Sequence, residues 1–162
     1  MTNYIIMLRI KAILNCARAN EWEQVECFIK SSGLNVCEIR NQFGDTLLHI
    51  ALSHKASINV VDRLLEYIDI NEPNYQGITP LSSFIMSLLH YTPTDQVVYL
   101  DFLLDHGANL MQISDVPRAC FGWFPYLFAV RDASDALVAI MKQHGASLAP
   151  IKKLYANSVL IE

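Results

Sequence analysis

Hydrophobic residues in this chain recur at intervals of three and four positions, the spacing that places side chains on one face of an α-helix. Three such runs cover residues 61–65, 100–104 and 138–141. Gly107 and Gly145 follow the second and third runs, and a glycine in this place commonly marks the end of a helix. The pattern therefore predicts helices at these three places.

A short motif recurs in the stretches between the hydrophobic runs. Residues 44–51 read Gly-Asp-Thr-Leu-Leu-His-Ile-Ala, and residues 77–81 read Gly-Ile-Thr-Pro-Leu, 33 positions later. A more divergent copy at residues 122–129 keeps a glycine, a proline and an alanine at the same offsets. Glycine suits a tight turn, threonine can cap the following helix, and proline fits the first helical turn, where its missing N–H is not needed. The motif therefore predicts a turn followed by a helix start.

Together these motifs resemble the ankyrin repeat, which has a period of about 33 residues and a Thr-Pro-Leu-His-x-Ala core. The hydrophobic runs resemble the second half of that repeat, and a divergent first unit is matched by Cys16, Ala17, Val25, Phe28, Ile29 and Gly33. The resemblance implies an all-α fold, an ankyrin-repeat helical solenoid of stacked antiparallel helix pairs with hairpin loops. We expect one domain over residues 1–162, with units at 8–40, 41–73, 74–118 and 119–148 and a C-terminal capping helix at 150–162.

The resemblance also assigns roles to single residues. In the family the motif histidine binds across to the adjacent loop, and here His49 takes that place. Ser82 and Leu127 stand at this position in the other copies, so we expect the polar link to be absent or altered there. The positions expected in the core or at a structural turn include Phe28, Thr79, Pro80, Leu81, Leu103 and Leu104.

The composition of the 162 residues suits a continuous hydrophobic core. Hydrophobic residues make up 52% and charged residues 17%, below the roughly 25% charged residues of an average soluble domain. The net charge of −4 provides no basic surface, so we do not expect the chain to bind nucleic acid.

The N-terminal residues 1–16 are expected to form a capping helix. Residues 4–8 are apolar, but the basic residues Arg9 and Lys11 follow them, which is the reverse of the order in a secretory signal. A lipoprotein cleavage site ending at Cys16 is the alternative, although Asn15 is large where a small residue is expected. No run approaches the ~18 apolar residues of a transmembrane helix, so no membrane association is expected.

The sequence has no recognisable catalytic or metal-binding motif. The four cysteines form no Cys-x-x-Cys pair and have no histidine at zinc-ligand spacing, so we expect them to be buried free thiols: Cys16, Cys27, Cys37 and Cys120. A catalytic Cys–His pair is the less favoured alternative. The remaining histidines are expected at helix ends or in loops: His54, His90, His106 and His144. We therefore expect no catalytic residues, no metal and no cofactor.

Two insertions separate this chain from a regular ankyrin pattern. Thr46 and Leu64 are 18 residues apart, whereas the corresponding Thr79 and Leu103 are 24 residues apart, because of extra residues within 88–96. A second excess lies within residues 111–120. Insertions in repeat arrays map to loops, often on the binding side, but long surface loops also arise neutrally at little cost.

Aromatic or apolar residues stand beside the glycine of each hairpin turn. In an ankyrin solenoid these tips and the first helices of the pairs form a concave surface that binds partners, and aromatic side chains make good anchors there. Packing between neighbouring hairpins is the alternative role. The candidate partner-binding residues are Phe43, Asp45, Tyr75, Ile78, Phe121 and Trp123.

These observations favour a protein–protein interaction module over an enzyme. We expect it to bind another protein through the concave face and hairpin tips, as a monomer or weak homo-oligomer. It would act in the cytoplasm as a regulator or adaptor, or in a host cytosol as a pathogen effector. The alternative is an enzyme inhibitor, or an enzyme whose site lies in the inserted loops of the third repeat.

Overall fold

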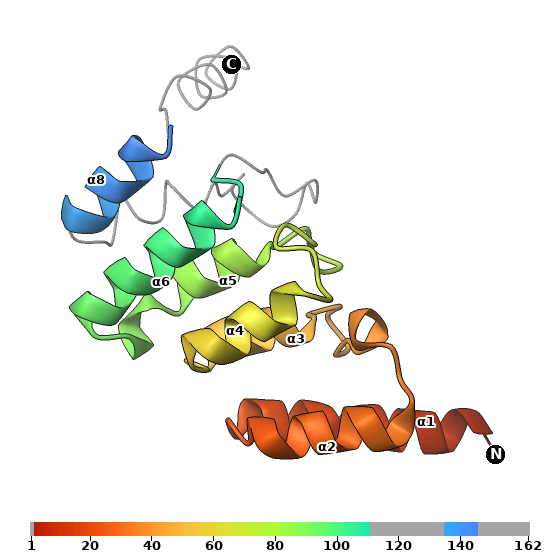
Figure 1. The fold of residues 1–162 in the computed structure, drawn as a ribbon. Helices are drawn as coiled ribbons and strands as arrows, with labels where there is room; N and C mark the ends of the chain where they lie inside the picture. Colours follow the sequence, from red (N-terminus) through yellow and green to blue (C-terminus); the bar gives the residue numbers. More distant parts are fainter. Residues whose placement is uncertain (1, 111–134, 146–162) are drawn as a thin grey trace, which may run out of the picture.

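The computed structural model describes residues 2–110 and 135–145, and these residues form helices and connecting loops (Figure 1). The first two helix pairs are α1 (Thr2–Arg18) with α2 (Trp22–Ser32), and α3 (Leu47–Ser53) with α4 (Ile58–Leu65). They are followed by α5 (Pro80–Met86), α6 (Pro93–Asp105) and α8 (Asp135–Gln143), and two short 3₁₀ helices are η1 (Val36–Glu38) and η2 (Leu88–His90). No β-strand occurs in the described ranges, so the expected all-α class is confirmed.

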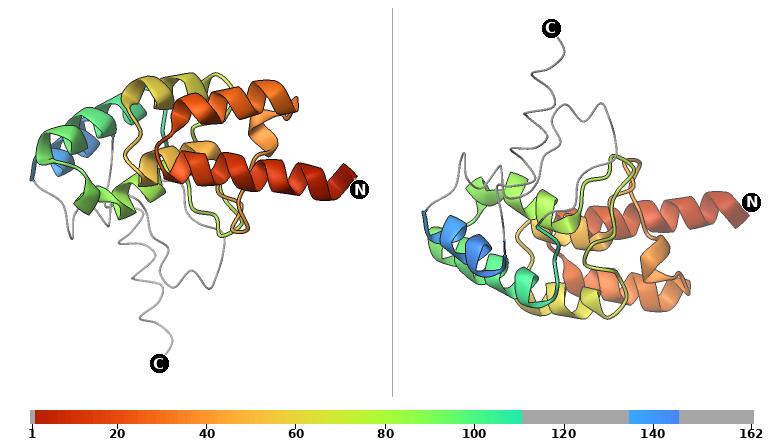
Figure 2. Two further views of the ribbon diagram at one scale, coloured as in Figure 1. Left: turned by 90° about the horizontal axis from the view of Figure 1, so that it is seen from below. Right: turned by 90° about the horizontal axis from the view of Figure 1, so that it is seen from above.

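The helices are stacked as antiparallel pairs, with α1 and α2 in the first layer, α3 and α4 in the second, and α5 and α6 in the third (Figures 1 and 2). The first helices α1, α3 and α5 pack in succession, and α8 packs on α6. The loops after α2 and α4 project on the same side of the stack (Figure 1). This arrangement is the helical solenoid that the sequence predicts.

The centre of the core is α3, which is held between the layers on both sides. Leu47, Leu48, Ala51 and Leu52 have no solvent exposure, and the whole helix is buried except for Ser53 at its end. A fully buried leucine side chain contributes about 1.5–3 kcal/mol of transfer free energy. A helix without an exposed face therefore depends on both neighbouring layers for its stability.

Threonine begins three of the helices. Thr46, Thr79 and Thr92 each accept a hydrogen bond from the backbone N–H three residues later. Such a cap satisfies one of the free N–H groups of the first turn and is worth about 1 kcal/mol. Pro80 and Pro93 follow two of these caps in the first helical turn, as the motif predicts.

The expectation that Phe28 lies in the core is wrong. Phe28 is 39% exposed, because the buried face of α2 follows Trp22 and Val25 with Ile29 partly buried beside them, and Phe28 lies one position away from that line. A shift of one residue rotates a side chain by about 100° around the helix.

The cysteines are also more exposed than expected. Cys27 and Cys37 are exposed and Cys16 is half-buried, while Cys120 lies outside the described residues. All three described thiols are free.

The first insertion is part of the packing between layers. Residues 88–96 form η2 and the start of α6, and Tyr91 in this segment is buried. The Tyr91 hydroxyl donates to the carbonyl oxygen of Leu52 at 2.5 Å. The Tyr99 hydroxyl donates to the carbonyl oxygen of Ala56 at 2.6 Å. The insertion therefore helps to join the third layer to the second. The second insertion, the 122–129 motif and the expected helix at 150–162 lie outside the described residues.

Candidate protein-binding surface

The two described hairpin tips, residues 41–46 and 74–79, are built by the same hydrogen bonds. The side-chain oxygen of Asn41 accepts from the backbone N–H groups of Phe43 and Asp45, at 2.8 and 3.0 Å. Thirty-three positions later, the Asn74 side chain accepts from the corresponding N–H groups of Gln76 and Ile78, at 2.9 and 3.0 Å. Each asparagine thus closes its own loop. Asparagine is common in turns because its side chain can bind nearby backbone N–H groups in place of a helix or sheet partner.

The carboxylate of Asp45 joins the two tips. One of its oxygens accepts from the Asn74 amide at 2.6 Å, and the other accepts from the Asn41 amide at 2.7 Å. The backbone adds a further link, because the N–H of Tyr75 donates to the carbonyl oxygen of Phe43 at 3.0 Å. The tips therefore form one connected ridge.

Two side chains behind the tips strengthen this connection. Arg40 forms an ion pair with Glu72 at 2.5 Å, and its guanidinium also donates to the carbonyl oxygens of Gly44 and Pro73. His49 is buried, and its Nε2 lies 2.8 Å from the carbonyl oxygen of Ile78, as the family resemblance implies.

The hydrogen bonds of His49 define its neutral form. The Thr46 N–H donates to Nδ1 at 3.2 Å, so Nδ1 is an acceptor and the proton is on Nε2, which donates to Ile78. Burial lowers the pKa of His49 below its ordinary value of 6.5, although the bond to Ile78 opposes this effect. A neutral imidazole committed on both nitrogens is a structural link rather than a proton-transfer group.

The ridge exposes aromatic side chains. Phe43 is 49% exposed and Tyr75 is 70% exposed. The ring of Tyr75 rests on Gly44, since a Cβ built on that glycine would lie 2.6 Å from Cδ1 of the tyrosine. An exposed ring supported by backbone in this way has little freedom to lose when a partner binds.

The structure separates the sequence-predicted site residues into three groups. Phe43 and Tyr75 are brought together on the exposed ridge. Asp45 is half-buried with both carboxylate oxygens bound within the protein, and Ile78 is half-buried with its carbonyl bound to His49. Phe121 and Trp123 lie outside the described residues.

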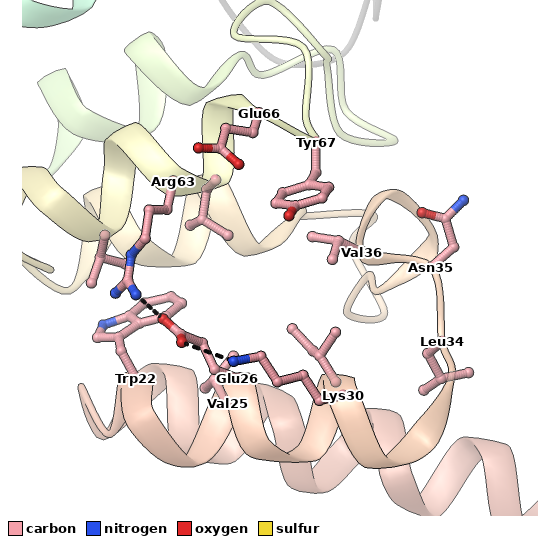
Figure 3. A pocket seen from close by; sticks show the side chains of 13 residues that line it. Trp22, Val25, Glu26, Lys30, Leu34, Asn35, Val36, Arg63, Glu66 and Tyr67 are labelled. Atoms are coloured by element: carbon pink, nitrogen blue, oxygen red, sulfur yellow. Dashed lines mark ion pairs between the residues drawn. The ribbon is translucent and has the colours of Figure 1, made fainter.

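A second surface feature was not predicted from the sequence. An apolar groove with a volume of about 560 Å³ lies between α2 and α4 (Figure 3). Arg63 on α4 forms an ion pair with Glu26 on α2, and Glu26 also pairs with Lys30 at 3.9 Å. The apolar lining comes from Trp22, Val25, Ile29, Val60, Leu64 and Tyr67. Both helices have ordinary amphipathic sequences, so no local signal indicates the space between them.

Two observations concern the described residues as a whole. None of their helices is long and apolar enough to cross a membrane. Asp101, Asp105 and His144 bring their ligand atoms close enough together to share a metal ion.

The comparison with known families agrees with this geometry. The family model described as "Ankyrin repeat" matches residues 43–75, from the aromatic residue of one tip to that of the next. The matched segment contains α3, α4 and the residues that connect the two tips. No curated protein matches the chain.

Proposed function

This chain is an ankyrin-repeat protein, and we propose that it binds a partner protein through the exposed ridge of its hairpin tips and the adjacent concave face. Ankyrin repeats are generally protein–protein interaction modules and typically have no enzymatic activity. The observation that carries the proposal is the exposure of Phe43 and Tyr75 on tips whose polar groups are bound internally.

The physical argument is that these tips are already organised for binding. Asn41, Asn74 and Asp45 hold the loops by hydrogen bonds that do not involve a partner. A partner therefore meets a fixed surface, and the entropic cost of ordering these loops has been met during folding. Aromatic residues bury a large area with few rotatable bonds, which is why they dominate binding energy at interfaces.

The roles within the proposed surface differ. Phe43 and Tyr75 are the direct anchors, and Phe121 and Trp123 remain sequence-predicted candidates that lie outside the described residues. Asp45 and Ile78 act indirectly, because their polar groups hold the two described tips together. Both roles that the sequence suggests for the tip residues are therefore supported. Asp45 and Ile78 connect neighbouring hairpins, whereas Phe43 and Tyr75 are exposed to a partner.

The test is photo-crosslinking combined with affinity measurement. A photoreactive amino acid replaces either Tyr75 on the ridge or Tyr67, which is 56% exposed and lines the groove between α2 and α4. We expect a crosslinked partner from position 75 and none from position 67. Crosslinking from position 67 alone would move the interface to the groove and contradict the proposal.

Affinity for the crosslinked partner then gives the energetic test. We expect Tyr75→Ala to weaken binding by at least about 30-fold, corresponding to the ~2 kcal/mol that defines a hot spot. Tyr67→Ala is the matched control and should leave affinity within about twofold. Equal losses in the two variants would contradict a ridge-centred interface.

We further propose that the protein acts as a regulator or adaptor in a reducing cytosol, including a host cytosol if it is a translocated effector. The free, exposed thiols of Cys27 and Cys37 support this location, because exposed thiols persist in reducing compartments. Cell fractionation with an antibody to the natural protein tests it. Recovery from an oxidising compartment with these cysteines in disulfides would contradict it.

A further inference from the structure

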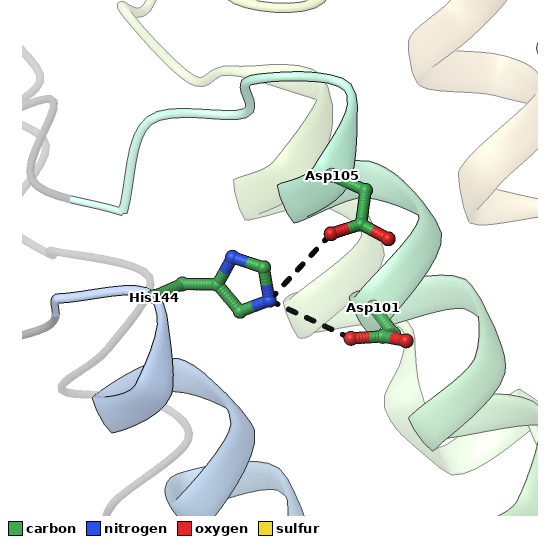
Figure 4. Close-up of side chains that lie close together, drawn as sticks. All are labelled: Asp101, Asp105 and His144. Carbon is green, nitrogen blue, oxygen red and sulfur yellow. Dashed lines mark ion pairs between the residues drawn. The ribbon is translucent and has the colours of Figure 1, made fainter.

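Three metal-ligating side chains meet where α8 packs on α6. Asp101 and Asp105 lie one helical turn apart on α6, and His144 follows directly after α8 (Figure 4). The Nε2 atom of His144 lies 3.5 Å from Oδ1 of Asp101 and 3.9 Å from Oδ1 of Asp105. One ligand atom from each residue lies within 4.8 Å of the other two.

This arrangement places two negative charges on the same face of one helix. Like charges at positions i and i+4 destabilise a helix, and here both carboxylates face the same imidazole nitrogen. A divalent cation would neutralise both charges while a neutral imidazole supplies a third ligand. The charge of the site and its set of donor atoms therefore match a single M²⁺ ion.

We propose that Asp101, Asp105 and His144 bind a divalent transition-metal ion, with zinc as the best-fitting common ion. Zinc accepts imidazole nitrogen and carboxylate oxygen together, and a site with three protein ligands leaves the fourth position to water. Magnesium and calcium prefer oxygen donors alone, so the histidine discriminates against them. The ion joins the segment of α8 to α6 of the third layer, because His144 directly follows α8 and both aspartates lie on α6.

The same chain contains a natural comparison for this site. His106 follows α6 as His144 follows α8, and it faces Asp62 on α4 at 3.7 Å. Glu66 stands four residues after Asp62, as Asp105 does after Asp101, but Glu66 lines the groove between α2 and α4. Among the described residues, the ligand atoms of Asp62, Glu66 and His106 do not come together as those of the first trio do, so His106 supplies a matched control.

Titration calorimetry of the full chain with zinc chloride tests the proposal, after alkylation of the cysteines to remove competing thiolates. We expect one zinc ion per chain, and His144→Ala should weaken binding by at least about tenfold. His106→Ala should bind zinc as the unchanged protein does. Absence of zinc binding, or equal losses from His106→Ala and His144→Ala, would overturn the proposal.

A second variant and a second readout protect this test from a folding artefact. Asp105→Asn keeps the size of an exposed side chain, and we expect it to weaken zinc binding by at least about tenfold as well. Zinc should slow amide hydrogen exchange in α8 of the unchanged protein, but not in Asp105→Asn, and magnesium should have no effect in either. Equal slowing by zinc in both proteins would place the ion elsewhere and overturn the assignment.

Discussion

The ring of Tyr75 packs so closely on Gly44 that no side chain fits between them. A Cβ at Gly44 would lie 2.6 Å from two ring atoms of Tyr75 and 2.7 Å from its backbone nitrogen. The backbone at Gly44 also has a φ of 82°, a conformation that residues with a Cβ rarely adopt. The contact between neighbouring tips therefore requires glycine for two independent reasons.

Gly44→Ala should destabilise the protein more than Gly107→Ala does. Gly107 has a similar φ of 86°, but a Cβ there would meet nothing within 4 Å. The Gly107 variant should therefore show only the left-handed strain of about 1–2 kcal/mol. The Gly44 variant must also displace the backbone of Tyr75, and we expect at least ~1 kcal/mol more. Urea denaturation measures both free energies, and equal losses would contradict the close packing of the tips.

The buried His49 predicts that stability falls in mild acid. The pKa of His49 is lowered in the folded state below its ordinary value of 6.5, mainly by burial. The unfolded chain then binds more protons between these two pKa values. The contribution of neutral His49 to the free energy of unfolding is therefore fully present above pH 6.5. It decreases as the pH falls toward the folded-state pKa and changes no further below that pKa. One such proton changes the free energy of unfolding by at most about 1.4 kcal/mol per pH unit.

Denaturation midpoints between about pH 5 and 8 test this dependence while most carboxylates stay ionised. His49→Gln should reduce the slope at the expense of overall stability, because the link to Ile78 is altered. His54→Gln is the control, since His54 is an exposed residue at the end of α3. A slope that persists in His49→Gln and disappears in His54→Gln would refute the assignment.

Leu104→Ala and Phe28→Ala should differ strongly in their effect on stability. Leu104 is 7% exposed in the core cluster, whereas Phe28 is 39% exposed on α2. Truncation of a buried leucine costs about 2–5 kcal/mol, and coupling between layers should spread the damage along the stack. We expect Phe28→Ala to cost less than ~1.5 kcal/mol. Similar denaturation midpoints for the two variants would contradict the packing of these layers.

The parts of the fold that follow from local sequence were predictable. The turn glycine, the threonine cap and the first-turn proline each act within a few residues, so Gly77, Thr79 and Pro80 indicate the start of α5 directly. The link from His49 to the next tip followed from the family resemblance, and the hydrogen bond to Ile78 confirms it.

Features that depend on the distance between layers were not predictable. Phe28 satisfies a helical spacing, but its exposure depends on where the neighbouring helix lies. The internal role of Asp45 depends on the Asn74 side chain of the next repeat. The Asp101–His144 contact likewise joins residues 43 positions apart, and nothing in either segment alone indicates it.

Tyr91→Phe should show that the first insertion stabilises the stack. The Tyr91 hydroxyl donates to the carbonyl oxygen of Leu52, in the last turn of α3, where carbonyl groups lack partners within the helix. Burial raises the pKa of Tyr91 far above its ordinary value of 10, so the hydroxyl remains a donor throughout the pH range of stability. Its removal leaves a buried acceptor unsatisfied, and we expect a cost of about 1–3 kcal/mol. The exposed Tyr67→Phe is the matched control and should change the free energy of unfolding by less than ~0.5 kcal/mol. If Tyr91→Phe is as stable as this control in urea denaturation, residues 88–96 are a surface loop rather than part of the interface between the second and third layers.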